Sequence, residues 1–538
     1  MNGSQATWNA AATSAQGDRS VHAPVAARRP PLDLPRIAIG TALILGLWFL
    51  NKGGEFGSVV FFIILTVMAL LSPDKAMKAM AIMFAGLLLN VAFVPKTIFW
   101  TPGRLALPVV ILLRYGFHLF VNPRLLLGRP YYLMLLVYVA TMAACSIASG
   151  WYTQIALFKL GNFIAFMTTA FLVTALVRER KQDLSEWFVS LIIAAALIGV
   201  LAVATGQSRN FVALRTGQTI TSDSLFNGAF LHPNAHALYA SGMTVFLCCI
   251  YILAPYRHRL AVVPVIVLWL VFMLLSQSRT SVFATTVPLL VLVALAAPRT
   301  VRGGRQLRSN VRRSTLVAIL VAAVGAAGVF DLASGGVVSK SIIGFLHKWS
   351  DREAESLDTE TMLASRQSLI DQAWGNFVEN PWTGIGFQVA KTQAFMDNAT
   401  FYTAPAEKGF LPVAILEEGG VVGATAFALF LLVLVGTWYR ERNIPAIIVF
   451  TSFLTSNMGE ATMLAPGGGG AFGWICVAAA TIMGDNCWTR APRAATDARR
   501  RTSSPPLGPP EPIWPGRRTT TAACSAGGSF GGTAPTSG

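Results

Sequence analysis

The segment DREAESLDTETMLASRQSLIDQAWGNFVEN, residues 351–380, lies at the centre of a long polar stretch, Ser334–Lys408, in a chain that is otherwise largely apolar. Of the 538 residues, 54% are hydrophobic and 12% are charged, whereas about a quarter of the residues in soluble domains are charged. The mean hydropathy is +0.56. This composition predicts a polytopic membrane protein in which Ser334–Lys408 forms one large polar loop.

Apolar runs of membrane-spanning length lie on both sides of this loop. A spanning helix needs about 20 mainly apolar residues, which predicts an all-α protein with about 12–14 transmembrane helices. The candidate runs are residues 36–50, 57–72, 76–94, 103–121, 131–149, 155–177, 187–205, 232–254, 261–276, 281–297, 314–333, 410–438, 444–458 and 468–484. The predicted parts are an N-terminal segment (1–35), eleven spans (36–333), the polar loop (334–409), three spans (410–484) and a tail (485–538).

The basic residues predict how the spans are oriented. The net charge is +17, but most Lys and Arg lie in the tails or in short connectors between apolar runs, which indicates topology signals and no nucleic-acid binding. The connectors are Arg178–Lys181, Arg257–Arg259, Arg299–Arg313 and Arg440–Arg442. If these connectors and both termini lie on the cytoplasmic side, then the polar loop, the loop Gly206–Leu231 and the turn Ser278–Thr280 lie on the outer side of the membrane. The polar loop agrees, because its nine acidic residues outnumber its six basic ones.

The two ends and the cysteines predict no further chemistry. Residues 1–30 lack the apolar core of a cleavable signal, so the first span is expected to direct insertion. The tail after Asp485 is rich in Pro, Gly, Thr, Ser and Arg, and it is expected to be disordered and cytoplasmic, like the N-terminal segment. The six cysteines follow no spaced pattern, so neither a disulfide framework nor a zinc site is predicted.

An amphipathic helix is predicted inside the polar loop. Its apolar residues recur at three- and four-residue spacing, and Asn380-Pro381 ends the pattern. They are Met362, Leu363, Leu369, Ile370, Ala373, Trp374, Phe377 and Val378. We expect this face to lie against the membrane domain. Arg366 shares the spacing and needs an anionic partner there, which is either an acid such as Asp371 or Glu379 or a bound phosphate group.

Two further groups of residues flank the loop. Gly384 and Gly386 lie in a turn after the helix, where glycine takes conformations closed to other residues. Glu417 and Glu418 carry carboxylates into the next span, and intramembrane acids are functional candidates. The alternative is a re-entrant or locally broken span, in which these acids face water or pair with Lys408.

Cations and histidines are also predicted on the outer face. Arg279 lies at the junction of two spans, where it either binds lipid headgroups by snorkelling or binds a phosphate; Arg215 lies in an outer loop. The sequence His232-Pro233-Asn234-Ala235-His236 begins a span, with Pro233 in its first turn. The i, i+4 histidines lack a third ligand, so hydrogen bonding at a cavity mouth or helix capping is favoured and no metal or cofactor is predicted.

The order of these motifs resembles the O-antigen ligase and polysaccharide polymerase family of bacterial membrane glycosyltransferases. The matching pieces are His232-Pro233-Asn234, Ser278-Arg279, Ser365-Arg366, Trp374, Asn380-Pro381, Gly384-Ile385-Gly386 and Glu418–Gly423. By motif the resemblance covers residues 200–430, and the topology is compatible over residues 36–484.

The resemblance implies a GT-C-like fold and metal-independent transfer of a glycan from an undecaprenyl-diphosphate carrier to a sugar hydroxyl. The reaction would take place at the periplasmic face of the inner membrane. By position, the family's diphosphate-binding roles fall on Arg279 and Arg366, and then on Arg215. Expected partners are the lipid-linked donor, the glycan acceptor, the bilayer and other polysaccharide-assembly proteins. Further substrate-binding candidates are His232, Asn234, His236, Lys408 and Glu418.

One position departs from the family pattern. Many ligases carry a His-Asn pair where this chain has Glu407-Lys408. Glu407 is the predicted general base, because a carboxylate within hydrogen-bonding reach can take the proton of an attacking hydroxyl. Rival bases are His232, His236, His347 and Glu460. The departure favours a polymerase of lipid-linked repeat units over a ligase that transfers polymer to lipid A-core.

Two other classes of protein remain as alternatives. A transporter or lipid-linked-sugar flippase would show inverted repeats or charges at mid-membrane, and the sequence shows neither. A structural membrane protein would leave Gly384, Gly386 and the position of Arg366 unexplained.

Overall fold

The computed structural model describes residues 32–207, 227–230, 233–253, 259–276, 278–296, 367–391, 408–459, 461–465 and 469–488. The predicted span 314–333, most of the two predicted disordered ends and much of the polar loop lie outside these residues. The predicted site residues Arg215, His232, Arg366 and Glu407 lie outside them too, as do His347 and Glu460.

The described residues form helices, turns and connecting segments without any strand; an isolated bridge joins Leu89 and Phe230. The first helices are α2 (Leu34–Leu50), α3 (Gly54–Leu71), α4 (Pro73–Leu88), α5 (Trp100–Tyr115), α6 (Phe117–Val121), α7 (Pro130–Ser149), α8 (Thr153–Glu179) and α9 (Ser185–Ala204). They are followed by α11 (Pro233–Leu253), α12 (Val263–Leu275), α13 (Arg279–Ala296), α17 (Gln367–Glu379), α19 (Leu411–Arg440), α20 (Ile444–Ser456) and α21 (Gly469–Trp488). The all-α prediction is therefore confirmed.

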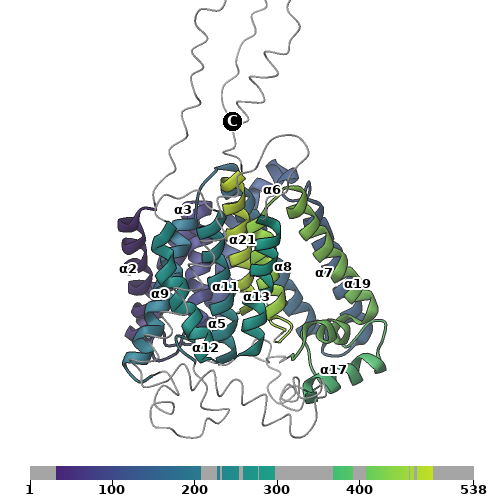
Figure 1. The fold of residues 1–538 in the computed structure, drawn as a ribbon. Helices are drawn as coiled ribbons and strands as arrows, with labels where there is room; N and C mark the ends of the chain where they lie inside the picture. Colours follow the sequence, from purple (N-terminus) through teal and green to yellow (C-terminus); the bar gives the residue numbers. More distant parts are fainter. Residues whose placement is uncertain are drawn as a thin grey trace, which may run out of the picture. The chain divides into compact units, whose positions relative to one another are not determined.

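The helices are those of a polytopic membrane protein. Among the described residues, six stretches are long and apolar enough to cross a membrane: Leu34–Leu71, Trp100–Val121, Pro130–Ser149, Thr153–Glu179, Ser185–Ala204 and Leu411–Arg440. Shorter apolar helices occupy Leu238–Leu253, Leu260–Leu275, Thr280–Leu292, Ile444–Ser456 and Gly469–Gly484. Each predicted span within the described residues coincides with a helix. Figure 1 shows these helices running side by side.

Buried aromatic rings fill the spaces between neighbouring helices. Tyr138 of α7 packs against Phe427 and Phe430 of α19, with ring centroids 5.3 and 6.4 Å apart. The Phe84 and Phe166 rings of α4 and α8 meet edge to face at 5.3 Å. Such pairs combine a large buried apolar area with a preferred geometry, so they fix how the helices pack.

Two of the predicted basic connectors meet at one end of the bundle. Glu441, which follows α19, binds Arg178 of α8 at 3.0 Å and Arg129, which precedes α7, at 3.1 Å. The connectors Arg178–Lys181 and Arg440–Arg442 therefore lie at the same end, as their predicted common side requires. At the opposite end, Ser149 of α7 donates to the carbonyl of Ile385, in the described part of the polar loop.

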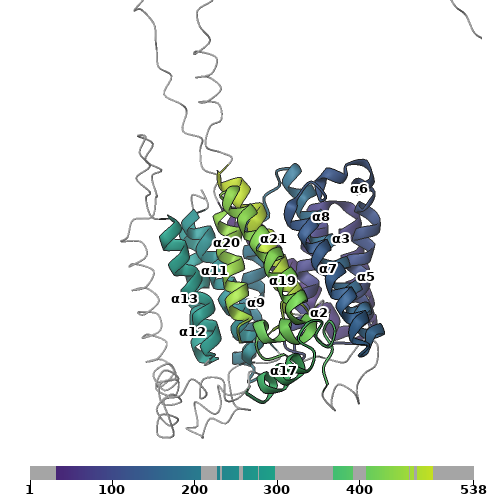
Figure 2. The same cartoon turned by 90° about the vertical axis from the view of Figure 1, so that its right-hand side faces the viewer.

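Helix α17 lies at this opposite end, next to α19, in Figures 1 and 2; we call it the α17 end. The helix stops at Glu379, immediately before the predicted terminator Asn380-Pro381. One face packs as predicted, with Ala373 buried. The prediction is wrong for Trp374 and Val378, which are exposed. Their spacing puts them beside the buried stripe, on a flank that α19 does not cover.

Candidate functional site

Helix α19 is broken at Gly420, and a turn of the polar loop fills the break. In an unbroken helix, the N–H groups of Val421 and Val422 would bond to the carbonyls of Glu417 and Glu418. Instead, Val421 and Val422 donate to the carbonyls of Pro381 (2.8 Å) and Trp382 (3.3 Å). The carbonyls of Glu417 and Glu418 accept from Ile385 (2.8 Å) and Gly386 (3.0 Å). All four backbone groups thus remain paired, now with residues 381–386.

Glycines permit this close approach of two backbones. Gly420 has φ +58° and ψ −162°, a combination open essentially to glycine alone. A Cβ at Gly420 would lie 2.3 Å from the carbonyl carbon of Trp382, and one at Gly384 would lie 2.4 Å from the carbonyl oxygen of Glu417. Gly384 and Gly386 also have positive φ angles, +63° and +111°. The special conformations predicted for Gly384 and Gly386 are confirmed.

A buried ion pair lies beside the break. The Lys408 ammonium donates to a carboxylate oxygen of Glu417, and the two side chains are only 3% and 4% exposed. Lys408 also donates to the carbonyl of Val389 at 2.8 Å, and the Asn376 amide of α17 donates to the other Glu417 oxygen at 2.7 Å. Of the alternatives left open by the sequence, the locally broken span with an acid paired to Lys408 is therefore observed.

Glu418 lies in the same buried cluster. Its carboxylate accepts from the Gln388 side chain at 3.1 Å, and the backbone carbonyl of Gln388 accepts from the Lys159 ammonium of α8 at 2.6 Å. No sequence pattern above pointed to Lys159, Gln388 or Asn376. Lys159 had a usable signal, because it is the one charged residue between Thr153 and Val177 in an apolar helix. We call the paired residues Lys159, Asn376, Gln388, Lys408, Glu417 and Glu418, with the inserted turn 381–386, the junction.

The turn after α20 connects the junction to the start of α13. The Lys408 carbonyl accepts from the N–H of Ala461 at 3.2 Å. Two residues earlier, Gly459 packs so closely on Thr280 that a Cβ there would lie 2.3 Å from the Thr280 hydroxyl oxygen. Thr280 follows Arg279 in the chain, and Lys408 follows Glu407. The chain neighbours of these two predicted catalytic residues therefore contact Gly459 and Ala461, which lie two positions apart in the chain.

The predicted site residues that the structure describes lie in different surroundings. Arg279 is the first residue of α13, and Asn234 lies in the first turn of α11, which begins at Pro233 as predicted. Lys408 and Glu418 are buried in the junction. His236 is fully buried, with Phe230, Phe272 and Trp269 ring centroids at 5.3, 5.7 and 6.0 Å. A substrate-binding role for any of these residues stays a prediction.

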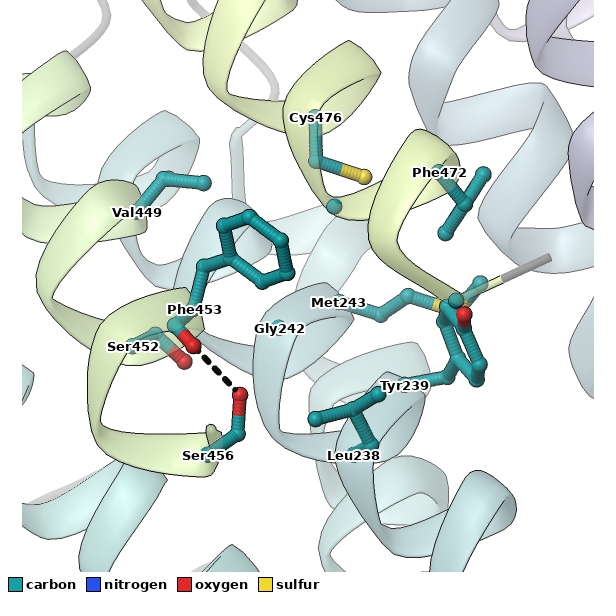
Figure 3. Close-up of a pocket in the computed structure, with 12 residues that line it drawn as sticks. Leu238, Tyr239, Gly242, Met243, Val449, Ser452, Phe453, Ser456, Phe472 and Cys476 are labelled. Atoms are coloured by element: carbon teal, nitrogen blue, oxygen red, sulfur yellow. Dashed lines mark hydrogen bonds between the residues drawn. The ribbon is translucent and has the colours of Figure 1, made fainter. Parts of the chain in front are cut away.

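A small cavity lies between α11, α20 and α21 (Figure 3). Its volume is about 30 Å³, and its lining includes Tyr239, Phe453, Phe472 and Cys476. The Ser456 hydroxyl at its edge donates to the Phe453 carbonyl at 2.8 Å. This volume holds only one or two water molecules, so the cavity does not fit a sugar or a diphosphate. Within the described part of the chain, no group of three His, Cys, Asp or Glu side chains is placed to hold a metal ion.

Lys96 is a further cation at the α17 end. It follows α4, and the bridge between Leu89 and Phe230 places this connector beside the start of α11. The ammonium donates to the Gly86 carbonyl and lies 4.5 Å from the centroid of the Trp100 ring. Burial lowers the pKa of Lys96 to about 7. Burial penalises the charged form, which the carbonyl and the ring only partly stabilise.

This pKa predicts a pH-dependent stability. Between about pH 7 and pH 10 the unfolded chain keeps the Lys96 proton that the folded chain releases, so folding stability rises with pH. Below that window both states are protonated, and the full cost of burying the charge remains. We expect the apparent melting temperature in detergent to rise less with pH in K96M than in the wild type. The exposed Lys52 provides the control, since K52M should keep the wild-type rise; equal rises in K96M and wild type would contradict the prediction.

Comparison with known proteins identifies the region that contains the junction residues other than Lys159. The family model described as O-Antigen ligase matches residues 264–428, from α12 into α19. This stretch includes Arg279, the turn with Gly384 and Gly386, and the broken part of α19. The predicted resemblance is therefore confirmed over residues 264–428. No curated protein matches the chain.

Proposed function

From the match of residues 264–428 to the O-antigen ligase family model, we propose that the protein polymerises undecaprenyl-diphosphate-linked oligosaccharide repeat units of an exopolysaccharide or an O-antigen. One lipid-linked chain is the donor and another lipid-linked unit is the acceptor. The reaction takes place at the periplasmic face of the bacterial inner membrane, which the proposal identifies with the α17 end. The observation that best supports this proposal is that Thr280 and Lys408, the chain neighbours of Arg279 and Glu407, contact Gly459 and Ala461, which lie two positions apart in the chain.

In the proposed reaction the acceptor hydroxyl oxygen bonds to the anomeric carbon of the donor. The bond from that carbon to the diphosphate breaks, and the lipid diphosphate leaves with the electron pair. Glu407 takes the proton of the hydroxyl. Arg279 and Arg366, with Arg215, bind the diphosphate, because the planar guanidinium forms bidentate, charge-assisted hydrogen bonds with phosphate oxygens. Preorganised cations stabilise the negative charge that the leaving group acquires.

The junction has a supporting role in this proposal. Lys408 and Glu418 are buried and bonded to protein groups, so we assign them to holding the two segments together instead of touching the glycan. Lys408 fixes the chain one residue after Glu407. Asn376 ties α17, which begins one residue after Arg366, to Glu417 at 2.7 Å.

A ligase that transfers finished polymer to lipid A-core is the second candidate, favoured by the description of the matching family. The two functions share the donor and the leaving group and differ in the acceptor. Glu407-Lys408, at the position of the His-Asn pair of many ligases, supports the polymerase.

Substitution of the three proposed catalytic residues tests the function. Purified protein is reconstituted with lipid-diphosphate repeat units, and polymer length and released lipid diphosphate are measured. R279A, R366A and E407Q are each expected to reduce polymer formation by about 100-fold or more, the usual cost of losing an electrostatic or general-base group.

The controls use the same residue types elsewhere in the chain. R36A and E379Q alter exposed side chains and should leave polymer length unchanged. Normal long-chain polymer in all three catalytic variants would refute the assignment. Addition of lipid A-core as acceptor separates the ligase, which would attach glycan to it. Transport of the lipid-linked unit without polymer or released diphosphate would instead identify a flippase.

A further inference from the structure

Helix α17 has three distinct sides. One side is buried against the bundle and includes Ala373 and Asn376. The second is polar: Gln372 donates to the Lys391 carbonyl at 3.3 Å, and Glu379 pairs with the Lys391 ammonium at 2.7 Å. The third side is exposed and carries large apolar residues, with the exposed Asp371 beside them.

The described part of the chain leaves the large apolar residues of this side about half exposed or more. Trp374 is 49% exposed and Val378 is 61% exposed. Trp382, just after the helix, is 68% exposed. We call Trp374, Val378 and Trp382 the apolar flank. A helix with a buried side, a polar side and an uncovered aromatic side has more apolar surface than packing against the bundle requires.

The apolar flank continues onto the membrane-spanning part of α19. The Trp382 carbonyl accepts from the N–H of Val422, so the Trp382 backbone lies where the second part of α19 begins. That part, Val421–Arg440, has 20 residues, about the length needed to cross a bilayer. Its first residues, Val421 and Val422, are exposed and apolar, as are Leu429 and Leu432 further along.

We propose that the apolar flank lies in the headgroup region of the bilayer, so that α17 rests on the membrane surface at the α17 end. We assign lipid as the partner of the flank because the flank is continuous with α19. The Trp382 backbone is bonded to α19 at the level where the exposed apolar surface of the span starts. Tryptophan is enriched at this depth, since its ring has an apolar body and a polar N–H. A helix with one apolar side lies in the interface plane instead of crossing it.

This placement has a consequence for the diphosphate site, and that consequence rests on the proposed function. Helix α17 begins one residue after Arg366. A helix held at headgroup depth keeps the adjoining residue at the depth at which the diphosphate of a lipid carrier lies. The apolar flank then sets the height of Arg366 relative to the bilayer.

Site-directed spin labelling in lipid nanodiscs tests the proposal. Nitroxides are attached to W374C and V378C in a full-length chain in which Cys487 and Cys524 carry serine. G375C is the matched control, because Gly375 lies on the other exposed side of the same helix and a Cβ there meets nothing within 4 Å. Accessibility to oxygen, which partitions into lipid, is compared with accessibility to a water-soluble nickel chelate.

The labels on the flank are expected to be several-fold more accessible to oxygen than to nickel, with the reverse for G375C. Equal, water-like accessibility at V378C and G375C would overturn the proposal, and V378C gives this result even if W374C fails to fold. Dipolar broadening that grows with label density would show a second copy on the flank and would also overturn it.

An activity measurement separates the flank from the proposed reaction. V378D should lose the oxygen accessibility of a label at Trp374 and reduce polymer yield, whereas G375D should change neither. Loss of the lipid contact without any change in polymer yield would break the link to the diphosphate site. Loss of activity in R366A with full activity in V378D would also break the link to the diphosphate site, although the spin-label result would stand.

Discussion

Replacing Lys408 with methionine is expected to lower the free energy of unfolding by about 3–5 kcal/mol, the usual cost of removing one partner of a buried ion pair. The Glu417 carboxylate, 4% exposed, would keep only the Asn376 amide and have no counter-charge. The Val389 carbonyl would lose its donor as well. The measurement is the unfolding midpoint of the purified protein in detergent, followed by circular dichroism.

Two further variants test whether this loss of stability arises from the Lys408–Glu417 ion pair. The double variant K408M/E417Q removes both charges of the pair, and we expect it to be more stable than K408M, because the Glu417 charge is then no longer buried without its partner. K391M is the matched control: it breaks an ion pair with Glu379 in the same segment, but these side chains are 27% and 65% exposed. Its expected cost is about 1 kcal/mol or less. A K408M variant as stable as K391M would contradict a structural role for the buried pair.

The helical fold was predictable because its signal is local. Apolar runs mark the spans, and Asn380-Pro381 correctly predicted the end of α17. The faces of α17 were only partly predictable. Spacing groups Ala373, Trp374 and Val378 on one broad stripe, but the width of stripe that α19 covers depends on tertiary packing. Trp374 and Val378 therefore remain exposed although their positions in the pattern are apolar.

The junction was predictable from glycines and acids and not from its partners. The glycines at positions 384 and 386 and the two glutamates are unusual at their positions, so their residue types alone raised them as candidates, whereas the sequence did not single out Gly420. Asn376 and Gln388 are ordinary polar residues in a polar loop. Their role depends on contacts over separations of 41 and 30 residues, and no local pattern specifies such contacts.

Replacing Gly420 with alanine is expected to reduce activity more than a glycine-to-alanine replacement at any other position of α19. The Cβ would meet the Trp382 backbone at 2.3 Å, and the backbone angles strain any L side chain by about 1–3 kcal/mol. In G420A, we expect α19 to relieve this strain by becoming regularly helical through residue 420. The hydrogen bonds from Val421 and Val422 to the carbonyls of Glu417 and Glu418 would then form. The turn 381–386 then loses its four partners and leaves α19.

The loss of the turn displaces the parts that the junction joins. Glu417 is separated from Asn376, and α17 is no longer held beside α19. A misplacement of about 1 Å in an active site can cost about 100-fold in rate, so we expect polymer formation by G420A to fall by at least that factor. Limited proteolysis should show faster cleavage within residues 367–391 at unchanged helix content, which a globally unfolded variant would not show.

Gly436 gives the comparison within the same helix. It lies in the regular part of α19, and a Cβ there meets nothing within 4 Å. G436A should therefore keep wild-type activity and gain up to about 1 kcal/mol from the better helix propensity of alanine. If G420A matches G436A in both activity and protease resistance, the break at residue 420 does not hold the turn, and the junction is not what joins the polar loop to the bundle.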